Sequence, residues 1–365
     1  MKILLDARLY NDYQHGIGRY TYELCKGLAN NPDLNLSILV NKASSLINDS
    51  NLADVKKIIT PIKPFGLANQ LKLSELVSQI QPDIFHVPHF AAPVNQPCKT
   101  VITIHDLIHV RFAKDYSIFH SIYYKYFVKK AMVNASHIVT ISEFSKNDLI
   151  KWFREQACLF PTNKISVIYN GIDTQHFSPC PGPYPLISIP YLLYVGNYKP
   201  HKNIKTLIKA FAILCQDKEF NYKLVLGGQI PKYVKELIFY YGLLSKVYIT
   251  GIIDEKSLPI IYSNATLFIF PSLYEGFGFP PLEALACACP VITSKLASLP
   301  EILQSSAYYA DPCTAEQLAK TIDKLLRNKD LQDDLRQKGL SHVKNYSWDK
   351  TIIETIKVYE NVLRI

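Results

Sequence analysis

Two series of short apolar segments, each followed by a stretch of helical length, lie on either side of a proline-rich segment. Residues 178–190 hold five prolines in thirteen positions, which excludes a regular helix or a central strand. Strands that alternate with helices are typical of a parallel sheet covered on both faces. Because a chain of 365 residues also exceeds the size of one ordinary core, the sequence predicts an α/β protein of two doubly wound domains joined at this segment.

The expected strands are short and apolar. In the first domain, residues 1–178, they are 2–6, 36–40, 84–87, 101–104, 137–141 and 165–168. In the second domain, residues 185–345, they are 191–195, 223–226, 247–250, 267–270 and 290–293. Hydrophobic residues make up 48% of the chain and charged residues 19%, a globular composition without a signature of disorder.

The net charge of +9 favours anionic partners such as nucleotides or an anionic membrane surface. A nucleic-acid partner is not expected, because the sequence has no Lys/Arg block and no clustered aromatic motif. An acid at Asp6 interrupts the apolar start of the chain, and no later run approaches the length of a membrane span. We therefore expect a cytoplasmic protein, with peripheral attachment to the inner face of the cytoplasmic membrane as a further option.

One segment of the first domain combines aromatic residues with lysines. Helical spacing over residues 116–132 places five large side chains on one face: Phe119, Ile122, Tyr123, Tyr126 and Phe127. The basic side chains lie largely elsewhere: His120, Lys125, Lys129 and Lys130. The ordinary interpretation is a helix whose apolar stripe packs in the core and whose basic face meets solvent. The same basic face would attract anionic lipid, at about 1 kcal/mol per charge close to the surface.

The stretch from Pro271 to Ala284 carries most of the chemical information. It leaves an apolar strand, passes through a glycine-rich loop and enters a helix whose first-turn amides, with the glycines, can approach a phosphate. Glu275 and Glu283 bracket the loop, and a carboxylate can accept hydrogen bonds from neighbouring hydroxyls of a hexose or a ribose. The alternative is that Glu275 is a turn residue and that Glu283 only favours the helix dipole.

Glu275 and Glu283, separated by seven residues and wrapped around Gly-Phe-Gly-Phe-Pro-Pro, resemble the E-x7-E signature of the GT4 family of glycosyltransferases. Further matching motifs follow the family's order along the chain: GIGRY at 16–20, VTISEFS at 139–145, IYNGID at 168–173 and VGNYKPHKN at 195–203. The resemblance covers nearly the whole chain. It implies a GT-B fold, in which two Rossmann-like domains face a central cleft. The donor would lie on the second domain and the acceptor side on the first, with the C-terminal helix, residues 346–365, packing back onto the first.

By this resemblance, Glu275 would hold hydroxyls of the transferred hexose and Glu283 would hold the ribose. Backbone amides around three loop residues would contact the hexose and the diphosphate: Gly276, Phe277 and Gly278. Lys202, in the loop after the first strand of the second domain, would neutralise the leaving diphosphate, and stabilisation of developing charge is usually the largest catalytic contribution. Its alternative is an ordinary solvated lysine.

The match departs from the family pattern at Asn197, where many relatives carry an arginine. One phosphate-binding cation is therefore missing. Lys199 and His201 lie within a few residues on the same loop, and either can replace it. The alternative for His201 is an exposed loop histidine.

The first domain supplies three further candidates. Gly16 and Gly18 lack the Cβ that would keep their loop away from donor phosphates, although taken without the other motifs they are better explained by a plain strand-to-helix turn. His105 ends an apolar strand, where parallel sheets border their ligand crevice, and in relatives a histidine here contacts the donor sugar. The alternative for His105 is a core histidine satisfied by the backbone.

Other polar residues of the first domain have mainly structural interpretations. Asp6 is expected to form a cap or a turn at the end of the first strand. Three histidines are assigned either to the structure or to the acceptor side: His86, His89 and His109.

The resemblance implies transfer of a hexose, with retention of anomeric configuration, from a nucleotide sugar to a hydroxyl of a glycan or lipid-linked acceptor. Similarity to mannosyltransferases of bacterial polysaccharide assembly makes GDP-mannose the first choice of donor and a UDP-hexose the second. Because no donor loop carries a D-x-D motif, no metal and no cofactor are expected. The alternatives are a catalytically silent nucleotide-sugar-binding subunit, and an epimerase or phosphorylase of the same fold.

Overall fold

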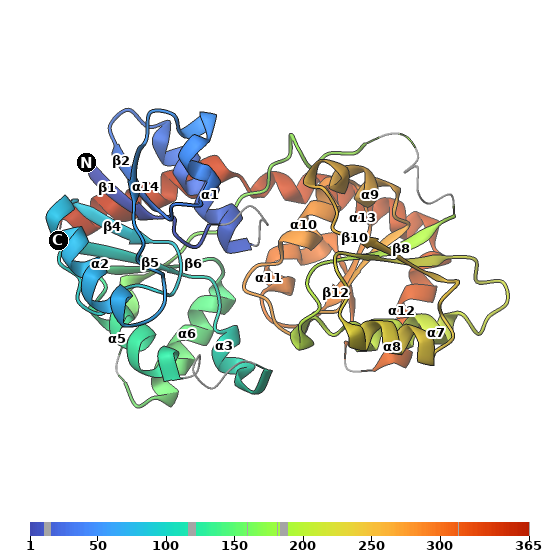
Figure 1. Ribbon diagram of the computed structural model, residues 1–365. Coiled ribbons are helices and arrows are strands. Elements are labelled where there is room, and N and C mark those ends of the chain that lie inside the picture. Colours follow the sequence, from blue (N-terminus) through green and yellow to red (C-terminus); the bar gives the residue numbers. More distant parts are fainter. Residues whose placement is uncertain are drawn as a thin grey trace. The chain divides into compact units, whose positions relative to one another are not determined.

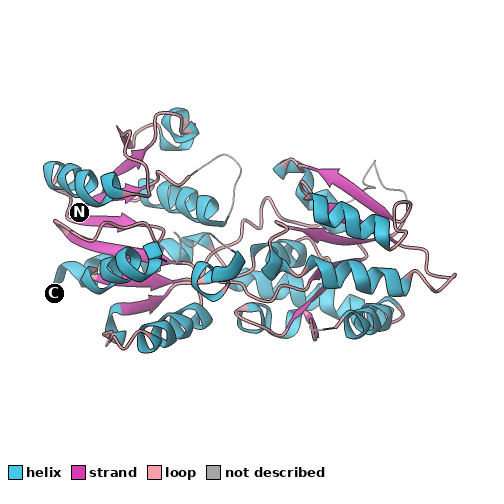
Figure 2. Cartoon of the chain, turned by 60° about the horizontal axis from the view of Figure 1, so that its bottom comes forward, coloured by secondary structure: helices cyan, strands magenta, loops and turns pink. Residues whose placement is uncertain are grey.

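The computed structural model describes residues 1–10, 16–115, 122–158, 160–180, 182, 189–312 and 314–364. It contains two compact units, one formed by Met1–Gly171 with Ser347–Ile365 and the other by Ile172–Tyr346. In each unit, helices cover both faces of a parallel sheet (Figure 2). Residues 172–178, which the proline pattern assigns to the first domain, belong to the second unit. Most of the proline-rich segment lies outside the described residues.

The sheet of the first unit has seven parallel strands in the order β3-β2-β1-β4-β5-β6-β7. These strands are β1 (Lys2–Asp6), β2 (Asn35–Val40), β3 (Lys56–Ile59), β4 (Ile84–Val87), β5 (Lys99–Ile104), β6 (His137–Thr140) and β7 (Ile165–Val167). The described helices are α1 (Gly16–Ala29), α2 (Leu67–Ile80), α3 (Ile108–Arg111), α5 (Lys129–Asn134), α6 (Glu143–Glu155) and α14 (Trp348–Arg364). The strand order reverses between β1 and β4, which are neighbours.

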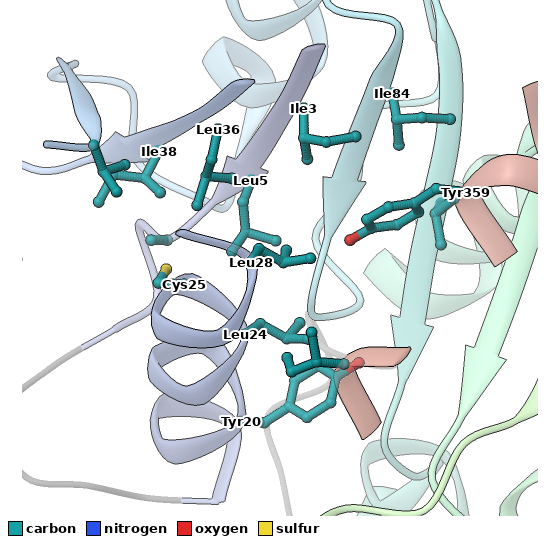
Figure 3. Close-up of a cluster of buried hydrophobic side chains, with 14 of the residues drawn as sticks. Ile3, Leu5, Tyr20, Leu24, Cys25, Leu28, Leu36, Ile38, Ile84 and Tyr359 are labelled. Carbon is teal, nitrogen blue, oxygen red and sulfur yellow. The ribbon is translucent and has the colours of Figure 1, made fainter. Parts of the chain in front are cut away.

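A cluster of buried apolar side chains joins α1, the sheet and α14 in the first unit. Tyr20, Leu24 and Leu28 recur on one face of α1, and with Ile3 on β1 they belong to the cluster drawn in Figure 3. The C-terminal helix reaches the same cluster through Tyr359, and in Figure 1 the red α14 runs through the blue part of the chain. The last segment of the sequence is therefore part of the core of the first unit.

The sheet of the second unit has six parallel strands in the order β10-β9-β8-β11-β12-β13. These strands are β8 (Tyr191–Val195), β9 (Lys223–Gly227), β10 (Val247–Gly251), β11 (Leu267–Phe270), β12 (Val291–Ser294) and β13 (Tyr308–Ala310). The described helices are α7 (Ile204–Leu214), α8 (Lys232–Tyr240), α9 (Leu258–Asn264), α10 (Phe279–Ala286), α11 (Leu299–Leu303), α12 (Ala315–Leu326) and α13 (Lys329–His342).

All strands that the sequence predicts are present, with ends that differ by one or two residues. Two edge strands, β3 and β13, have no predicted counterpart. β3 begins with two lysines and has no fully buried residue, and β13 has only three residues. β3 does not form the continuous apolar run that identifies a buried parallel strand, and the run at β13 is shorter than a typical strand.

The aromatic segment of the first unit differs from the expected amphipathic helix. Phe119 and His120 lie outside the described residues. Ile122 and Tyr126, expected in the core, are 47% and 61% exposed, whereas Tyr124 and Val128 are buried. The predicted core stripe is therefore wrong for Ile122 and Tyr126, whereas Tyr123 is partly buried against the core. The reason is that Tyr124–Val128 forms a π-helical turn, whose i→i+5 bonds do not follow the 3.6-residue spacing on which the prediction rests.

Candidate active site

The strand order of the second unit reverses between the neighbouring strands β8 and β11. In open parallel sheets, ligands bind beyond the carboxyl ends of the strands at such a switch point. Residues 196–203 leave β8 there and residues 271–278 leave β11, and Gly276 and Phe277 are buried in the second of these loops. The topology thus brings together the two loops whose motifs predict donor binding.

Lys202 and Glu275 come from these two loops and form an ion pair. Nζ of Lys202 donates to Oε1 of Glu275 at 2.6 Å, and the two side chains are only 10% and 12% exposed. Nζ also lies 5.0 Å from the centre of the Phe270 ring, within the range of a cation–π contact. Because an ammonium group has three N–H donors, Lys202 can hold Glu275 and also donate to a phosphate oxygen. Lys202 is therefore not the solvated lysine of the alternative interpretation.

Hydrogen bonds hold the two loops against each other. The carbonyl of His201 accepts from the Leu273 amide at 2.7 Å and from Ser272 Oγ at 3.1 Å. Ser298, just before α11, donates from Oγ to the carbonyl of Glu275 at 3.0 Å. Both serines are fully buried. They support the backbone on either side of the ion pair, and the sequence does not predict them because a lone serine outside a motif carries no positional signal.

Gly278 lets the second loop turn into α10. Its φ of 100° is in the left-handed region, and a Cβ there would lie 2.9 Å from Cδ2 of Leu299. The helix begins at Phe279, so Pro280 and Pro281 hold its second and third positions, and the first turn lacks two amides. An anion at this end of α10 would therefore depend largely on amides of the preceding loop.

Glu283 lies on α10 and is only 4% exposed. Its Oε2 accepts a hydrogen bond of 2.9 Å from the hydroxyl of Tyr262, which is buried on α9. A carboxylate offers about four lone-pair sites, so this bond leaves capacity for hydroxyls of a ligand. Tyr262 thus orients the carboxylate, and the sequence does not single it out from the 24 tyrosines of the chain.

The loop after β8 carries the two candidates to replace the missing arginine, Lys199 and His201. Asn197 is exposed, and its Oδ1 accepts from the Lys199 amide at 3.2 Å. His201 is only 4% exposed; burial, reinforced by Lys202 and Lys199, lowers its pKa to about 3. The His201 ring is therefore neutral at pH 7 and cannot supply the second positive charge. Of the two candidates, Lys199, whose side chain is exposed, remains the predicted replacement.

Lys199→Gln is expected to weaken binding of a nucleoside diphosphate by about tenfold, the effect of losing one charge-assisted hydrogen bond of about 1.4 kcal/mol. Binding of the corresponding monophosphate should change much less, because it lacks the second phosphate. Calorimetric titration of both nucleotides measures the two effects. The control is Lys199→Arg, which keeps the charge. An equal loss of affinity for both nucleotides, or no loss for either, would contradict the assignment of Lys199 to the second phosphate.

Gly16 and Gly18 lie in the first turn of α1 in the first unit, not in a loop before it. Gly16 is exposed and Gly18 is buried, and residues 11–15 before them lie outside the described residues. The amides in the first turn of a helix can bind a phosphate. The approach of this segment to a donor phosphate therefore stays a prediction, with a helix N-terminus in place of the expected loop.

His105 lies directly after β5 and is 8% exposed. Its Nε2 is 2.9 Å from the carbonyl oxygen of Pro88, and because a carbonyl only accepts, Nε2 carries the proton. Burial lowers the pKa of His105 to about 4, against a smaller opposing effect of the Pro88 carbonyl, so the ring is neutral at pH 7. The hydrogen bond to the backbone that the alternative interpretation predicts is thus present. Because Nε2 carries the proton, Nδ1 is an acceptor that suits a hydroxyl.

Asp6 is part of a buried ion pair and not only of a turn. Its carboxylate accepts from Nε and Nη2 of Arg8, both at 2.7 Å, and from the Arg8 amide at 3.2 Å. Burial by itself raises the pKa of Asp6, and the adjacent guanidinium outweighs it and holds the pKa below its ordinary value. Nη2 of Arg8 also donates to Asn69 at 2.9 Å. This pair ties β1 to α2 beside the carboxyl edge of the sheet.

Comparison with known proteins places this fold among glycosyltransferases. The chain is 26% identical over 380 residues to O-antigen chain mannosyltransferase B of Escherichia coli, covering 99% of this chain and all of that protein. Sucrose-phosphate synthase from Thermosynechococcus elongatus superposes with a TM-score of 0.77 at 20% identity, covering 100% of this chain and 99% of that one. Anabaena Alr3699/HepE, solved in complex with UDP and glucose, superposes with a TM-score of 0.77 at 18% identity, covering 99% and 100%.

These structural likenesses confirm the predicted GT-B fold. The family model described as Glycosyltransferase Family 4 matches residues 15–176, and the model described as Glycosyl transferases group 1 matches residues 189–342. The two matches cover both units in the order that the motifs predict. The chain therefore belongs to the family 4 glycosyltransferases, with a group 1 glycosyl transferase domain as its second half.

Proposed function

We propose that this glycosyltransferase moves a hexose from a nucleotide sugar to a hydroxyl of a glycan or lipid-linked acceptor, with retention of anomeric configuration. The observation that carries the proposal is the Lys202–Glu275 pair at the switch point of the second unit. The pair puts a cation suited to a leaving diphosphate directly beside a carboxylate suited to hexose hydroxyls. Both groups are largely shielded from water. Electrostatic interactions are stronger in such a setting, because its dielectric constant is lower than that of water.

Each residue of the site has a defined task in this proposal. Lys202 donates to a diphosphate oxygen and stabilises the negative charge that develops as the bond to the hexose breaks. Glu275 accepts from hexose hydroxyls, Glu283 accepts from ribose hydroxyls, and Nδ1 of His105 accepts from a hydroxyl of the sugar. The leaving diphosphate takes the proton of the acceptor hydroxyl on the face from which it departs. No carboxylate nucleophile is therefore assigned, and the protein positions the reactants and neutralises charge.

GDP-mannose is the proposed donor, and synthesis of a surface polysaccharide is the proposed role. Both are supported by the similarity to an O-antigen chain mannosyltransferase along the full length of the two chains. A UDP-hexose is the alternative donor, because no described contact selects a nucleobase.

Nucleotide binding and turnover together test the function. A thermal-shift comparison of GDP, UDP and ADP identifies the base, since a ligand at 100 times its Kd stabilises the protein by about 2.7 kcal/mol. Transfer to added acceptor is expected with the matching nucleotide sugar. Nucleotide binding without transfer or hydrolysis would indicate a silent subunit, and a reaction without an acceptor hydroxyl would indicate an epimerase or a phosphorylase.

Turnover is expected to persist in EDTA, because Lys202, Lys199 and backbone amides supply the positive charge around the diphosphate. In the part of the chain that the structure describes, no three His, Cys, Asp or Glu side chains are grouped so that they could hold a metal ion. The measurement is the initial transfer rate before and after chelation, with a metal-dependent glycosyltransferase as the assay control. Complete loss that one divalent ion restores would reject this site.

An anionic membrane surface is the proposed location of the acceptor. The support lies in the first unit, where Lys125 and Lys130 are exposed in the same short segment as the exposed side chains of Ile122 and Tyr126. Exposed aromatic and basic side chains together suit attachment to anionic lipid. No helix in the described ranges combines the length and the hydrophobicity of a membrane span.

Changing Lys125, Lys129 and Lys130 together to Gln is expected to release the protein from anionic vesicles at low salt. The reason is the loss of three charges, worth about 1 kcal/mol each near the surface. Co-sedimentation measures binding, and nucleotide affinity should stay unchanged because these lysines lie in the other unit. The matched control is Lys232, Lys235 and Lys256 changed to Gln in the second unit. The membrane proposal would be wrong if the wild-type protein did not bind anionic vesicles and used a water-soluble acceptor efficiently.

A further inference from the structure

Four buried side chains of the first unit form a chain of hydrogen bonds from α14 to α1. The hydroxyl of Tyr359 lies 2.6 Å from Nδ1 of His86 on β4, and Nε2 of His86 lies 2.8 Å from Oγ1 of Thr103 on β5. The same Oγ1 lies 3.0 Å from the hydroxyl of Tyr20. Figure 3 shows Tyr20 and Tyr359 entering the same apolar cluster from their two helices. All four residues are fully buried.

Burial makes this chain sensitive to the loss of any one member. It lowers the pKa of His86 to about 3, so the ring is neutral and has one N–H donor and one acceptor nitrogen. If Tyr359 donates to Nδ1, then Nε2 donates to Thr103, and the opposite tautomer reverses both bonds. The state of one end therefore determines the bonding at the other end. Removing one hydroxyl leaves a polar partner unsatisfied away from water.

The chain ends against His105, the proposed sugar-contacting residue. The ring of Tyr20 meets the ring of His105 edge-on, with centroids 4.9 Å apart and an interplanar angle of 87°. Thr103 precedes His105 by two residues on the same segment, so one hydroxyl ties Tyr20 to the backbone that carries His105. The other contacts of His105 hold one ring nitrogen, through the Pro88 carbonyl, and its own carbonyl, through Ser145 Oγ at 2.8 Å. Tyr20 packs against the ring itself.

We propose that the Tyr359–His86–Thr103–Tyr20 chain is a positioning network that sets the orientation of the His105 ring and joins it to the N-terminal turn of α1. This inference rests on the proposed role of His105 in hexose transfer. Tyr20 follows Gly16 and Gly18 within one turn of α1, so the network fixes the predicted phosphate-approaching turn and the sugar-facing histidine relative to each other. Tyr359 acts from α14 without touching His105, through three hydrogen bonds.

Two substitutions at Thr103 separate positioning from filling of the core. Thr103→Val removes the hydroxyl at constant size and is expected to lower kcat about tenfold, with the donor KM within about twofold of wild type. Thr103→Ser keeps the hydroxyl and should restore most of kcat. Tyr359→Phe, at the far end, should lower kcat about fivefold. The matched control is Tyr22→Phe on α1, whose hydroxyl lies near the surface beside Asn51 and Asp49, outside the chain of four, and should leave kcat unchanged.

The double variant Thr103→Val/Tyr359→Phe is expected to be no slower than Thr103→Val alone, because both changes interrupt the same chain. If the two losses of kcat multiplied in the double variant, the two changes would act independently, which would overturn the network. The Tm of each variant shows whether it is folded under the assay conditions.

A readout without turnover keeps this inference separate from the proposed function. Histidine-selective ¹⁵N labelling, with His105→Gln to assign the signals, reports the ring nitrogens of His105. They are expected to shift in Thr103→Val and in Tyr359→Phe, and not in Tyr22→Phe. Unshifted His105 signals in Tyr359→Phe would refute the network even if the enzyme transfers hexose. Shifted signals in a protein that turns over no nucleotide sugar would keep the network and reject the proposed function.

Discussion

Lys202→Met is expected to lower kcat by about a thousandfold, the upper range for removing one preorganised group that stabilises developing charge. Nζ of Lys202 is the cation beside Glu275 at 2.6 Å, in a setting where only 10% of its side chain meets solvent. Methionine keeps the length and the apolar stem, so the loss reports the charge and its hydrogen bonds. Single-turnover kinetics at saturating donor measures the effect on the chemical step.

A second substitution, at Glu275, is expected to restore the stability lost in Lys202→Met without restoring turnover. Lys202→Met leaves the Glu275 carboxylate largely buried without its cation, which destabilises such sites by about 3–5 kcal/mol when shielding is complete and by less here. Adding Glu275→Gln removes the unpaired charge, so the double variant should regain Tm without regaining kcat. The control is Lys205→Met, an exposed lysine three residues along the chain whose Nζ lies over the Tyr233 ring at 5.7 Å. Similar losses of kcat at both lysines would refute the special role of Lys202.

Substitution of each of the two glutamates by the isosteric amide is expected to change a different kinetic parameter. Glu275→Gln should lower kcat by about a hundredfold with little change in donor KM, because it contacts the hexose as positive charge develops there. Glu283→Gln should raise the donor KM about tenfold and leave kcat close to wild type, because ribose contacts are equally strong in the ground state and the transition state. Tyr262→Phe, which removes the bond to Glu283 Oε2, should show the same KM effect in weaker form.

Initial-rate kinetics over a range of donor concentrations separates the two parameters. The matched control is Glu316→Gln, which changes an exposed carboxylate of the same unit at the start of α12. If Glu275→Gln and Glu283→Gln altered the same parameter by the same factor, their assignment to different parts of the donor would be wrong. Wild-type kinetics in both variants would remove them from the donor site altogether.

The sequence predicts the fold closely because its main signals are local. Buried parallel strands are continuous apolar runs, and each is followed by a stretch of helical length, so the two sheets follow from pattern alone. The exceptions are elements whose signal is weak or whose geometry is irregular. The lysine-rich edge strand β3 lacks an apolar run, and the π-helical turn Tyr124–Val128 replaces the expected stripe of Ile122 and Tyr126 with a different buried face.

For the site, the sequence by itself determined the loops and the residue types to which the proposed chemistry is assigned. The spacing of Glu275 and Glu283, the lysine after the first strand of the second domain and the glycine directly before α10 can all be recognised in short stretches of the sequence. A left-handed φ at Gly278 is a local requirement, so a glycine in a turn predicts it without knowledge of the fold.

Only the tertiary structure decided which of these residues meet and in what state of protonation. Lys202 pairs with Glu275 because β8 and β11, far apart in the chain, are neighbours in the sheet. His201 is neutral because the fold buries it, and burial disfavours the charged form, whereas the sequence left open whether it is an exposed loop histidine or binds phosphate. Tyr262 orients Glu283 from another helix. Contacts between distant segments and the loss of water around a side chain arise only when the chain is packed, so no local pattern of residues encodes them.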